Sequence, residues 1–204
     1  MFDKPTISAI IVAGGKGQRY GKQKQFELLL GKEVWRWSYE TFSAIVDQVI
    51  VAGIDCPSGE TRRETVENGL KLASGNYILI HDSARPLISQ TEIMELITFL
   101  TEKGVKSATM IMPLVNTIVD TSNGKVEYLN RENLRAIATP QGFEAEIIKK
   151  AHASASSEDV AYDDCQLVEK YLGIEPQFVM GSQKLHKLTY PEDLKLLEFY
   201  ASQS

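Results

Sequence analysis

The residues between positions 13 and 26 are the ones whose types and spacing could do chemistry. The segment AGGKGQRYGKQKQF follows the apolar run ISAIIV and contains four glycines, three lysines and one arginine. A glycine-rich turn at a strand end lets backbone N–H groups approach phosphate oxygens closely. Arg19 and Lys24 could add charge-assisted hydrogen bonds to the same anion. The segment therefore predicts either a phosphate-binding loop or a basic surface turn.

Two common phosphate-binding motifs do not describe this loop. The dinucleotide-binding pattern GxGxxG would begin at Gly15, but its sixth position is Tyr20. The Walker pattern GxxxxGK[ST] would place its first glycine at Lys16 and its Ser or Thr at Gln23. The missing third glycine disfavours a nicotinamide-dependent dehydrogenase, so the loop needs another interpretation.

Two charged residues farther along the chain could share a site with this loop. Asp82, in HDSARP, follows the apolar run YILI and so lies at the carboxyl end of a predicted strand, where open α/β sheets bind ligands. A carboxylate beside phosphate groups is a natural ligand for Mg²⁺, which prefers one or two carboxylates plus phosphate oxygens. The alternative for Asp82 is a turn residue or an ion pair with Arg85. Lys187 precedes a helix predicted to begin near Pro191, and its alternative is a solvated side chain.

The elements that would position these residues alternate between strands and helices. Strands are predicted by apolar, β-rich runs at 7–12, 48–52, 77–81, 107–112 and 176–181. Helices are predicted by amphipathic segments at about 34–45, 61–73, 90–103, 143–153 and 163–172, and by a last segment from Pro191. This alternation is typical of a parallel sheet covered by helices on both faces.

One segment breaks the alternation. In TIVDTSNGKVEYL, at 117–129, two β-type runs flank Ser-Asn-Gly, which is a strong hairpin signal. The outer residues of this hairpin are polar, so it is predicted to project from the sheet. We expect one domain over residues 1–204, with an arm at about 114–136.

Bulk composition limits the class of protein. The 204 residues are 43% hydrophobic, which is enough for one sizeable core, and the net charge of −5 argues against nucleic-acid and membrane-surface partners. Cys56 and Cys165 belong to no disulfide or zinc pattern, and the three histidines lack metal-ligand spacing. The apolar run at the start is too short to span a membrane. These features predict a reduced, cytoplasmic protein. The segment ASASSED, at 153–159, is predicted to be a surface loop.

Six segments together resemble the 2-C-methyl-D-erythritol 4-phosphate cytidylyltransferase family, within the sugar- and polyol-phosphate nucleotidyltransferases. They occur in family order over nearly the whole chain, as AGGKGQRYGKQKQF, SGETRRETVENGL, HDSARP, PLVNTI, NRENLRAIATPQGF and HKLTYPEDL. The resemblance implies an α/β fold: a Rossmann-like, three-layer, mostly parallel sheet with helices on both faces and a projecting β-hairpin arm. It also implies CTP as the nucleotide and Mg²⁺ as the cofactor.

The implied reaction transfers a cytidylyl group from CTP to 2-C-methyl-D-erythritol 4-phosphate. Its products are CDP-methylerythritol, an isoprenoid precursor, and pyrophosphate. The acceptor phosphate is already a dianion at neutral pH, since its second pKa is about 6, so it needs no general base. What the reaction requires is the alignment of two anions and stabilisation of charge at the α-phosphorus.

The resemblance also implies roles for individual residues. The catalytic cations are Arg19, Lys24 and Lys187, and the metal ligand is Asp82. The nucleotide-binding residues are Ala13, Gly14, Gly15, Gly17, Gly59, Glu60, Thr65, Ser83 and Arg85. The acceptor-binding residues are Thr117, Arg131 and Thr139. In the family the hairpin embraces a second subunit, so Arg131 is expected to serve the neighbour's active site in a homodimer.

Several positions depart from the family pattern. Gly14 stands where an alanine is frequent, Gln23 replaces a common proline, and Asn116 and Tyr162 replace a usual aspartate and threonine. The largest departure is the short connection GIDCPS after the second predicted strand. It predicts a sheet that is one strand–helix unit shorter than in relatives, with a more open cytosine pocket.

Two alternatives to the leading function remain open in the sequence. A ribitol 5-phosphate cytidylyltransferase would share the CTP-binding residues, although NRENLRAIATPQGF resembles the methylerythritol phosphate group more closely. A catalytically weak nucleotide-binding relative would fit the shortened connection. The presence of Arg19, Lys24, Asp82 and Lys187 argues against that second alternative.

Overall fold

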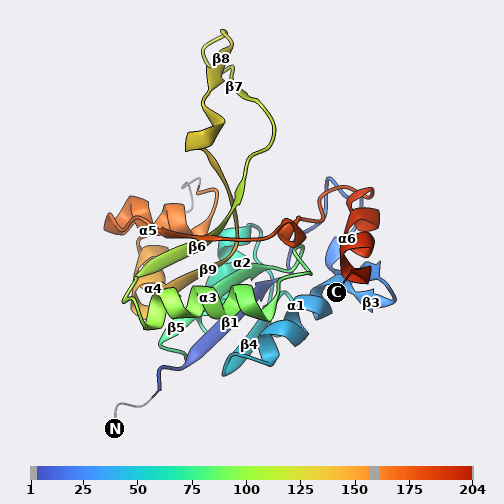
Figure 1. Cartoon of the computed structure of the whole chain (residues 1–204). Helices are drawn as coiled ribbons and strands as arrows, with labels where there is room; N and C mark the ends of the chain where they lie inside the picture. Colours follow the sequence, from blue (N-terminus) through green and yellow to red (C-terminus); the bar gives the residue numbers. More distant parts are fainter. Residues whose placement is uncertain (1–3, 157–160, 204) are drawn as a thin grey trace.

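A six-stranded sheet forms the centre of the computed structural model, which describes residues 4–156 and 161–203 (Figure 1). Its strands are β1 (Ile7–Val12), β4 (Gln48–Ala52), β5 (Tyr77–Asp82), β6 (Ser107–Pro113), β9 (Arg135–Glu144) and β10 (Gln177–Met180). They lie in the order β10-β6-β9-β5-β1-β4. β9 runs antiparallel to both neighbours, while the other pairs are parallel. The predicted fold class and the five predicted strands are confirmed, and β9 is an additional strand.

Helices cover both faces of this sheet, as predicted. On one face lie α1 (Val34–Ser43) and α3 (Gln90–Thr101), and on the other lie α2 (Arg62–Leu70), α4 (Ala145–Ser154) and α5 (Asp164–Leu172). The capping residues explain where two of these helices begin. The Ser89 and Thr61 side chains each accept a hydrogen bond from the third helical N–H, and Glu92 and Glu64 bond back to the caps.

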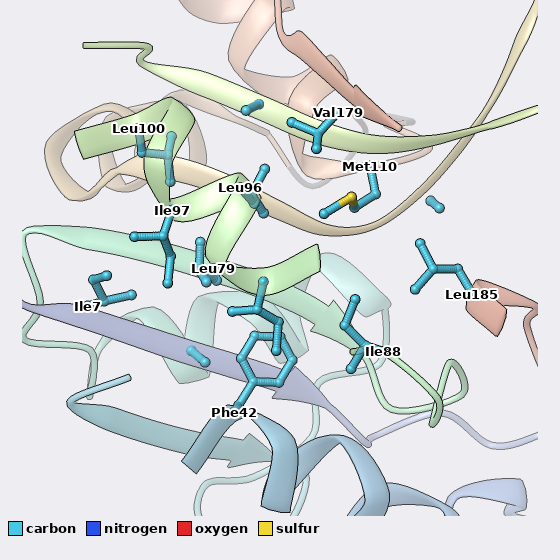
Figure 2. Packing of buried hydrophobic residues seen from close by; sticks show 14 of the residues in the cluster. Ile7, Phe42, Leu79, Ile88, Leu96, Ile97, Leu100, Met110, Val179 and Leu185 are labelled. Atoms are coloured by element: carbon cyan, nitrogen blue, oxygen red, sulfur yellow. The ribbon is translucent and has the colours of Figure 1, made fainter. Parts of the chain in front are cut away.

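One of the two main core clusters joins the α1 and α3 face to the sheet (Figure 2). Phe42 of α1 and Leu96 of α3 are fully buried and pack in the same cluster as Leu79 of β5 and Met110 of β6. Each such side chain contributes roughly 1.5–3 kcal/mol when it leaves water. Packing of this density fixes the carboxyl ends of β1 and β5 relative to one another.

A smaller cluster ties the C-terminal helix to the glycine-rich segment. The segment contains η1 (Lys24–Phe26) and is followed by a short hairpin of β2 (Leu28–Leu29) and β3 (Lys32–Glu33), which was not predicted. Leu29 and Val34 pack with Leu188 and with Leu197 of α6 (Asp193–Ser202). The segment around Lys24 and the segment that follows Lys187 therefore share one small core.

The predicted hairpin is present and projects from the sheet (Figure 1). It consists of β7 (Ile118–Asp120) paired antiparallel with β8 (Glu127–Leu129), followed by η2 (Arg131–Asn133). Val115, Val126 and Tyr128 are exposed on this arm, and Tyr128 is 75% accessible. An arm with such apolar side chains offers a surface that another molecule can cover.

The connection between β4 and α2 is short and contains no further strand or helix. Residues 53–61 are all described, and they pass from β4 to α2 with one isolated bridge, between Ala52 and Cys56, in place of a further strand. β4 is therefore an edge strand. Among the helices of the described chain, none combines the length and the apolar character needed to cross a membrane. The surface loop predicted at 153–159 lies partly outside the described residues.

Candidate active site

A polar cavity of about 370 Å³ opens at the carboxyl ends of β1 and β5. Most of the residues that the sequence assigns to a site line this one cavity. These residues are Gly14, Gly15, Gly17, Arg19, Lys24, Gly59, Glu60, Thr65, Asp82, Ser83 and Lys187. They come from four separate stretches of the chain, which the sheet and the small C-terminal core bring together.

The tight turn of the glycine loop depends on Gly17. Its φ is +65°, and a Cβ there would lie 1.8 Å from the carbonyl oxygen of Lys22. The Gly17 carbonyl accepts hydrogen bonds from the N–H groups of Tyr20 and Gly21 at 2.9 and 2.8 Å. The Tyr20 side chain is buried and anchors the turn. Only glycine fits this backbone, and a glycine turn of this kind can present N–H groups to an anion.

Gly14 is required by the short connection after β4. A Cβ on Gly14 would lie 2.6 Å from the Cβ of Ser58 and 3.0 Å from the Thr65 side chain. The Thr65 hydroxyl accepts a hydrogen bond from Gly59 N–H at 3.0 Å and donates one to the Thr61 carbonyl. The start of α2 therefore presses against the loop, which leaves no room for a side chain at position 14.

Lys24 is a half-buried cation held against the C-terminal loop. Its Nζ donates to the Leu188 carbonyl at 2.5 Å. Burial lowers the pKa of Lys24 to about 8, and the nearby charges of Lys187 and Arg19 add to this effect. Crowded cations of this kind become more stable when an anion binds among them.

Asp82 is buried, and both of its carboxylate oxygens are engaged. Oδ1 accepts from Arg62 Nε at 3.0 Å, and Oδ2 accepts from Lys187 Nζ at 2.5 Å. Burial alone would raise the pKa of Asp82, but the charges of Arg62, Lys187 and Arg85 outweigh it and hold this pKa well below its usual range. Asp82 is therefore an ionised carboxylate at the floor of the cavity.

The residues present fit a divalent cation that arrives with a phosphate ligand. Within residues 4–156 and 161–203, no group of three or more His, Cys, Asp or Glu could hold a metal by itself. A carboxylate offers about four lone-pair positions, and two of those on Asp82 accept hydrogen bonds here. Asp82 can therefore supply one ligand to Mg²⁺, whose other ligands are usually phosphate oxygens and water.

Three predicted site residues lie beneath the cavity instead of lining it. Ala13 is buried and donates its N–H to the Ala52 carbonyl. The Thr139 hydroxyl accepts from Asp82 N–H at 3.0 Å, and buried Arg85 donates to the Leu185 carbonyl. In this structure these three residues therefore support the cavity from below, and their contacts with ligands remain predictions.

Thr117 and Arg131 lie on the arm and do not line the cavity of their own chain. Arg131 Nη1 donates to the Val115 carbonyl at 2.8 Å, which holds its guanidinium against the other strand segment of the arm. Tyr162, which stands where the family often has threonine, is 85% exposed.

Several residues that line the cavity were not predicted from the sequence, and Arg62 is the one that contacts Asp82. It lines the cavity, and its guanidinium bonds both Asp82 and Asp164. One signal could have revealed it, because Arg62 is the first residue of α2. A cation there opposes the helix dipole, which favours acidic residues in the first turn, so another interaction must hold it.

Comparison with known proteins agrees with this geometry. The family model described as "IspD: 2-C-methyl-D-erythritol 4-phosphate cytidylyltransferase" matches residues 50–203. A protein of that name from Deinococcus radiodurans is 34% identical over 209 residues, which cover 95% of this chain and 89% of the relative.

Solved structures show the same relationship. The crystal structure of 2-C-methyl-D-erythritol 4-phosphate cytidylyltransferase from Thermus thermophilus has a TM-score of 0.77 and 25% identity, covering 98% of this chain and 99% of that one. The bifunctional IspDF from Campylobacter jejuni has a TM-score of 0.81 and 26% identity. The match covers 94% of this chain but 54% of that longer one. On the family match, the full-length similarity and the shared fold, this chain belongs to the 2-C-methyl-D-erythritol 4-phosphate cytidylyltransferase family.

Proposed function

We propose that this protein transfers a cytidylyl group from CTP to 2-C-methyl-D-erythritol 4-phosphate, giving CDP-methylerythritol and pyrophosphate. One observation carries the proposal beyond family membership. A single cavity joins a glycine loop to Arg19, Lys24 and Lys187, with the ionised Asp82 at its floor. That set of groups suits two phosphate-bearing substrates that repel each other.

The chemistry follows from the charges in the cavity. An oxygen of the acceptor phosphate attacks the α-phosphorus of CTP, and the bond between the α-phosphorus and its bridging oxygen to the β-phosphate breaks. Pyrophosphate leaves with that oxygen and its electron pair. No proton has to be removed from the acceptor, because its phosphate is already ionised at neutral pH. The protein's task is therefore alignment and charge stabilisation.

The cationic residues divide this task by position. The loop N–H groups and Arg19 suit the triphosphate, because they lie on the turn that follows β1. Lys24 Nζ donates to the carbonyl of Leu188, which packs in the small C-terminal core next to Lys187. We assign Arg19, Lys24 and Lys187 to the charge that develops at the α-phosphorus.

Asp82 is assigned to Mg²⁺ as a part of the same proposal. The bound cation would neutralise triphosphate oxygens and hold them in position for in-line attack. The remaining contribution of the protein is to keep Asp82 ionised, which Arg62, Lys187 and Arg85 do through their charges.

The base and the acceptor are assigned to opposite ends of the cavity. Gly59, Glu60 and Thr65 form the wall at the start of α2, and we assign them to cytosine. Glu60 is paired with Lys16 of the glycine loop at 2.9 Å, and both side chains are exposed, so this end is open to solvent.

We assign the acceptor to residues that include Arg131 of a second subunit. Three observations support a homodimer joined by the arms. The arm projects from the sheet (Figure 1), its apolar side chains are exposed, and Arg131 does not line the cavity of its own chain. The single nucleotidyltransferase domain would thus form a complete site only with a partner's arm.

Pyrophosphate release by the purified protein tests the function. The assay compares 2-C-methyl-D-erythritol 4-phosphate with ribitol 5-phosphate as acceptors, and CTP with ATP, GTP and UTP as donors. We expect the methylerythritol phosphate and CTP pair to react fastest by a wide margin. Faster turnover of ribitol 5-phosphate would establish the alternative of a ribitol 5-phosphate cytidylyltransferase. CTP binding without turnover of any acceptor would establish a nucleotide-binding relative. Equal use of all four nucleotides would refute the cytosine pocket.

A further inference from the structure

Arg62 lies between two buried carboxylates that belong to different parts of the fold. Its Nε donates to Asp82 Oδ1 at 3.0 Å, and its Nη1 donates to Asp164 Oδ2 at 2.7 Å. Asp82 lines the cavity, whereas Asp164 does not. Burial disfavours the charge on Arg62, but Asp164 and Asp82 together raise its pKa above its already high ordinary value. Arg62 is thus a permanent cation shared by one carboxylate in the site and one beneath it.

Because two carboxylates share Arg62, its guanidinium does not make all the hydrogen bonds that it could. A guanidinium can bind a carboxylate through two parallel N–H groups, and this bidentate arrangement is its strongest pairing. Here each carboxylate accepts from one nitrogen of Arg62, while Nη2 is buried without a hydrogen-bond partner in the described structure. Neither Asp82 nor Asp164 therefore has the full interaction that Arg62 can provide.

Asp164 is the more firmly fixed of the two partners. It is the first residue of α5 and is 2% exposed. Its N–H donates to Gln141 Oε1 at 3.0 Å, and its Oδ1 lies 3.1 Å from His152 Nε2. Contacts from β9, α4 and α2 thus hold this carboxylate in one place. The fold therefore fixes the position from which the Asp164 carboxylate attracts Arg62.

We propose that Asp164 is a positioning residue that draws Arg62 away from Asp82 and so keeps Asp82 available to the divalent cation that binds with CTP. This inference rests on the proposed function of the cavity. A metal contact on Asp82 would compete with the attraction between Asp82 and Arg62, and Arg62 must stay paired when that happens. Asp164 supplies the pairing, since an unpaired buried guanidinium would be costly.

The proposal predicts a specific effect of removing the Asp164 charge. In Asp164→Asn, Arg62 loses its competing carboxylate and can close on Asp82 with both N–H groups. Asp82 then binds Mg²⁺ less well. At the same time the region loses one negative charge, so an anionic nucleotide should bind at least as tightly without metal. A merely structural lesion would weaken both kinds of binding together.

The experiment measures metal and nucleotide binding separately. Calorimetric titration of Mg²⁺ into the protein saturated with CTP gives the metal affinity, without any acceptor or turnover. Titration of CTP in the presence of EDTA gives the metal-free nucleotide affinity. We expect Asp164→Asn to weaken Mg²⁺ binding roughly tenfold, the scale of one charge-assisted hydrogen bond gained by Asp82. The metal-free CTP affinity should be unchanged or tighter.

Asp163→Asn is the matched control. Asp163 neighbours Asp164 and caps α5 by accepting from Gln166 N–H, but it does not contact Arg62. Asn caps helices about as well as Asp, so this variant should keep wild-type Mg²⁺ and CTP affinities. An equal loss of Mg²⁺ affinity in both variants would overturn the proposal, because it would reflect disturbance of α5.

A second variant keeps the proposal testable if Asp164→Asn does not fold. Arg62→Gln removes the competing guanidinium, so Mg²⁺ should bind the CTP complex as tightly as in the wild type or more tightly. Adding Asp164→Asn to Arg62→Gln should change the metal affinity no further. Weaker Mg²⁺ binding in Arg62→Gln, or unchanged Mg²⁺ binding in Asp164→Asn, would overturn the proposal. Wild-type protein that binds CTP and Mg²⁺ but turns over no acceptor would instead refute the proposed function.

Discussion

At the scale of single residues, the site depends on cations that are held close together before any ligand binds. Burial lowers the pKa of the half-buried Lys24 to about 8, and the charges of Lys187 and Arg19 add to this effect. Crowded cations lower the folding stability of the protein without a ligand, and a bound anion restores that stability. Strain of this kind is common at functional sites, where local rules are broken for the sake of chemistry.

The first prediction concerns the size of the electrostatic contribution. Arg19→Ala and Lys24→Ala should each lower kcat by roughly a hundredfold or more, the usual scale for one preorganised contact to developing charge. The affinity for CTP should fall less, because rate depends on contacts that strengthen in the transition state. Steady-state kinetics and CTP calorimetry check both values.

Lys22→Ala is the control for these variants. Lys22 lies on the same loop but pairs with Glu27 at 2.6 Å and does not line the cavity. Its removal should leave kcat within about twofold of the wild type, as expected for an exposed ion pair. A loss of rate in Lys22→Ala equal to that in Lys24→Ala would mean that the loop responds to net charge and that no residue has a specific role.

The second prediction concerns pH. Because the pKa of Lys24 is lowered to about 8, the free enzyme loses the Lys24 charge as the pH rises through that value. The kcat/KM of the wild type should therefore fall above about pH 8, since kcat/KM reports groups of the free enzyme. Lys24→Arg keeps its charge and should show no such fall. A wild-type profile that stays level well above that pH would contradict this assignment.

At the scale of elements, the sequence predicted most of the strands and helices. It did not predict which buried residues lie beneath the cavity. The continuous apolar runs of β1, β4, β5 and β6 are unmistakable as buried strands, and the hairpin has the Ser-Asn-Gly turn. β9 was not predicted, because its pairing is antiparallel and non-local and it contains Thr139-Pro140. Such pairing leaves little local signal.

The supporting positions were hidden from the sequence for a similar reason. Arg85 and Thr139 belong to quoted motifs, but whether a side chain faces the cavity or the layer beneath it depends on tertiary packing. Arg62 was missed because its two partners are 20 and 102 residues away along the chain. Charge pairing over such separations cannot be inferred from local pattern.

A prediction at this scale concerns the short connection between β4 and α2. Gly14→Ala should raise the KM for CTP, because the new Cβ would collide with Ser58 and push α2 away from the glycine loop. Adding Ser58→Gly removes the nearest contact and should restore part of the lost affinity. Kinetics with varied CTP check both variants. If the double variant is no better than Gly14→Ala alone, the connection does not constrain the loop.

At the scale of the whole molecule, the proposed dimeric site combines the cavity of one subunit with the arm of the other. Arg131, the proposed acceptor-binding cation, lies at the end of a projecting hairpin and does not line the cavity of its own chain. A symmetric dimer resolves this, because each arm can serve the partner's cavity. The sequence alone implied the arrangement only through resemblance to the family.

Mixing two defective chains tests this shared site. Lys24→Ala damages a chain's own cavity, whereas Arg131→Ala damages the cavity that its arm serves and should mainly raise the KM for the acceptor. In a mixed dimer one site carries both lesions and the other carries neither. After full subunit exchange at equal amounts, roughly a quarter of all sites should regain wild-type kinetics. A mixture that exchanges subunits yet shows only the summed activity of its parents would return Arg131 to its own chain.

The central claim is that the acceptor phosphate itself attacks the α-phosphorus of CTP in the cavity between the glycine loop and Asp82. The most direct test uses 2-C-methyl-D-erythritol 4-phosphate labelled with ¹⁸O in its phosphate oxygens, with CTP and Mg²⁺, followed by ³¹P NMR of the products. The account predicts CDP-methylerythritol with an ¹⁸O bridge that shifts both phosphorus signals, together with unlabelled pyrophosphate. A product with an unlabelled bridge, or no CDP-methylerythritol from folded protein that binds CTP, would contradict it.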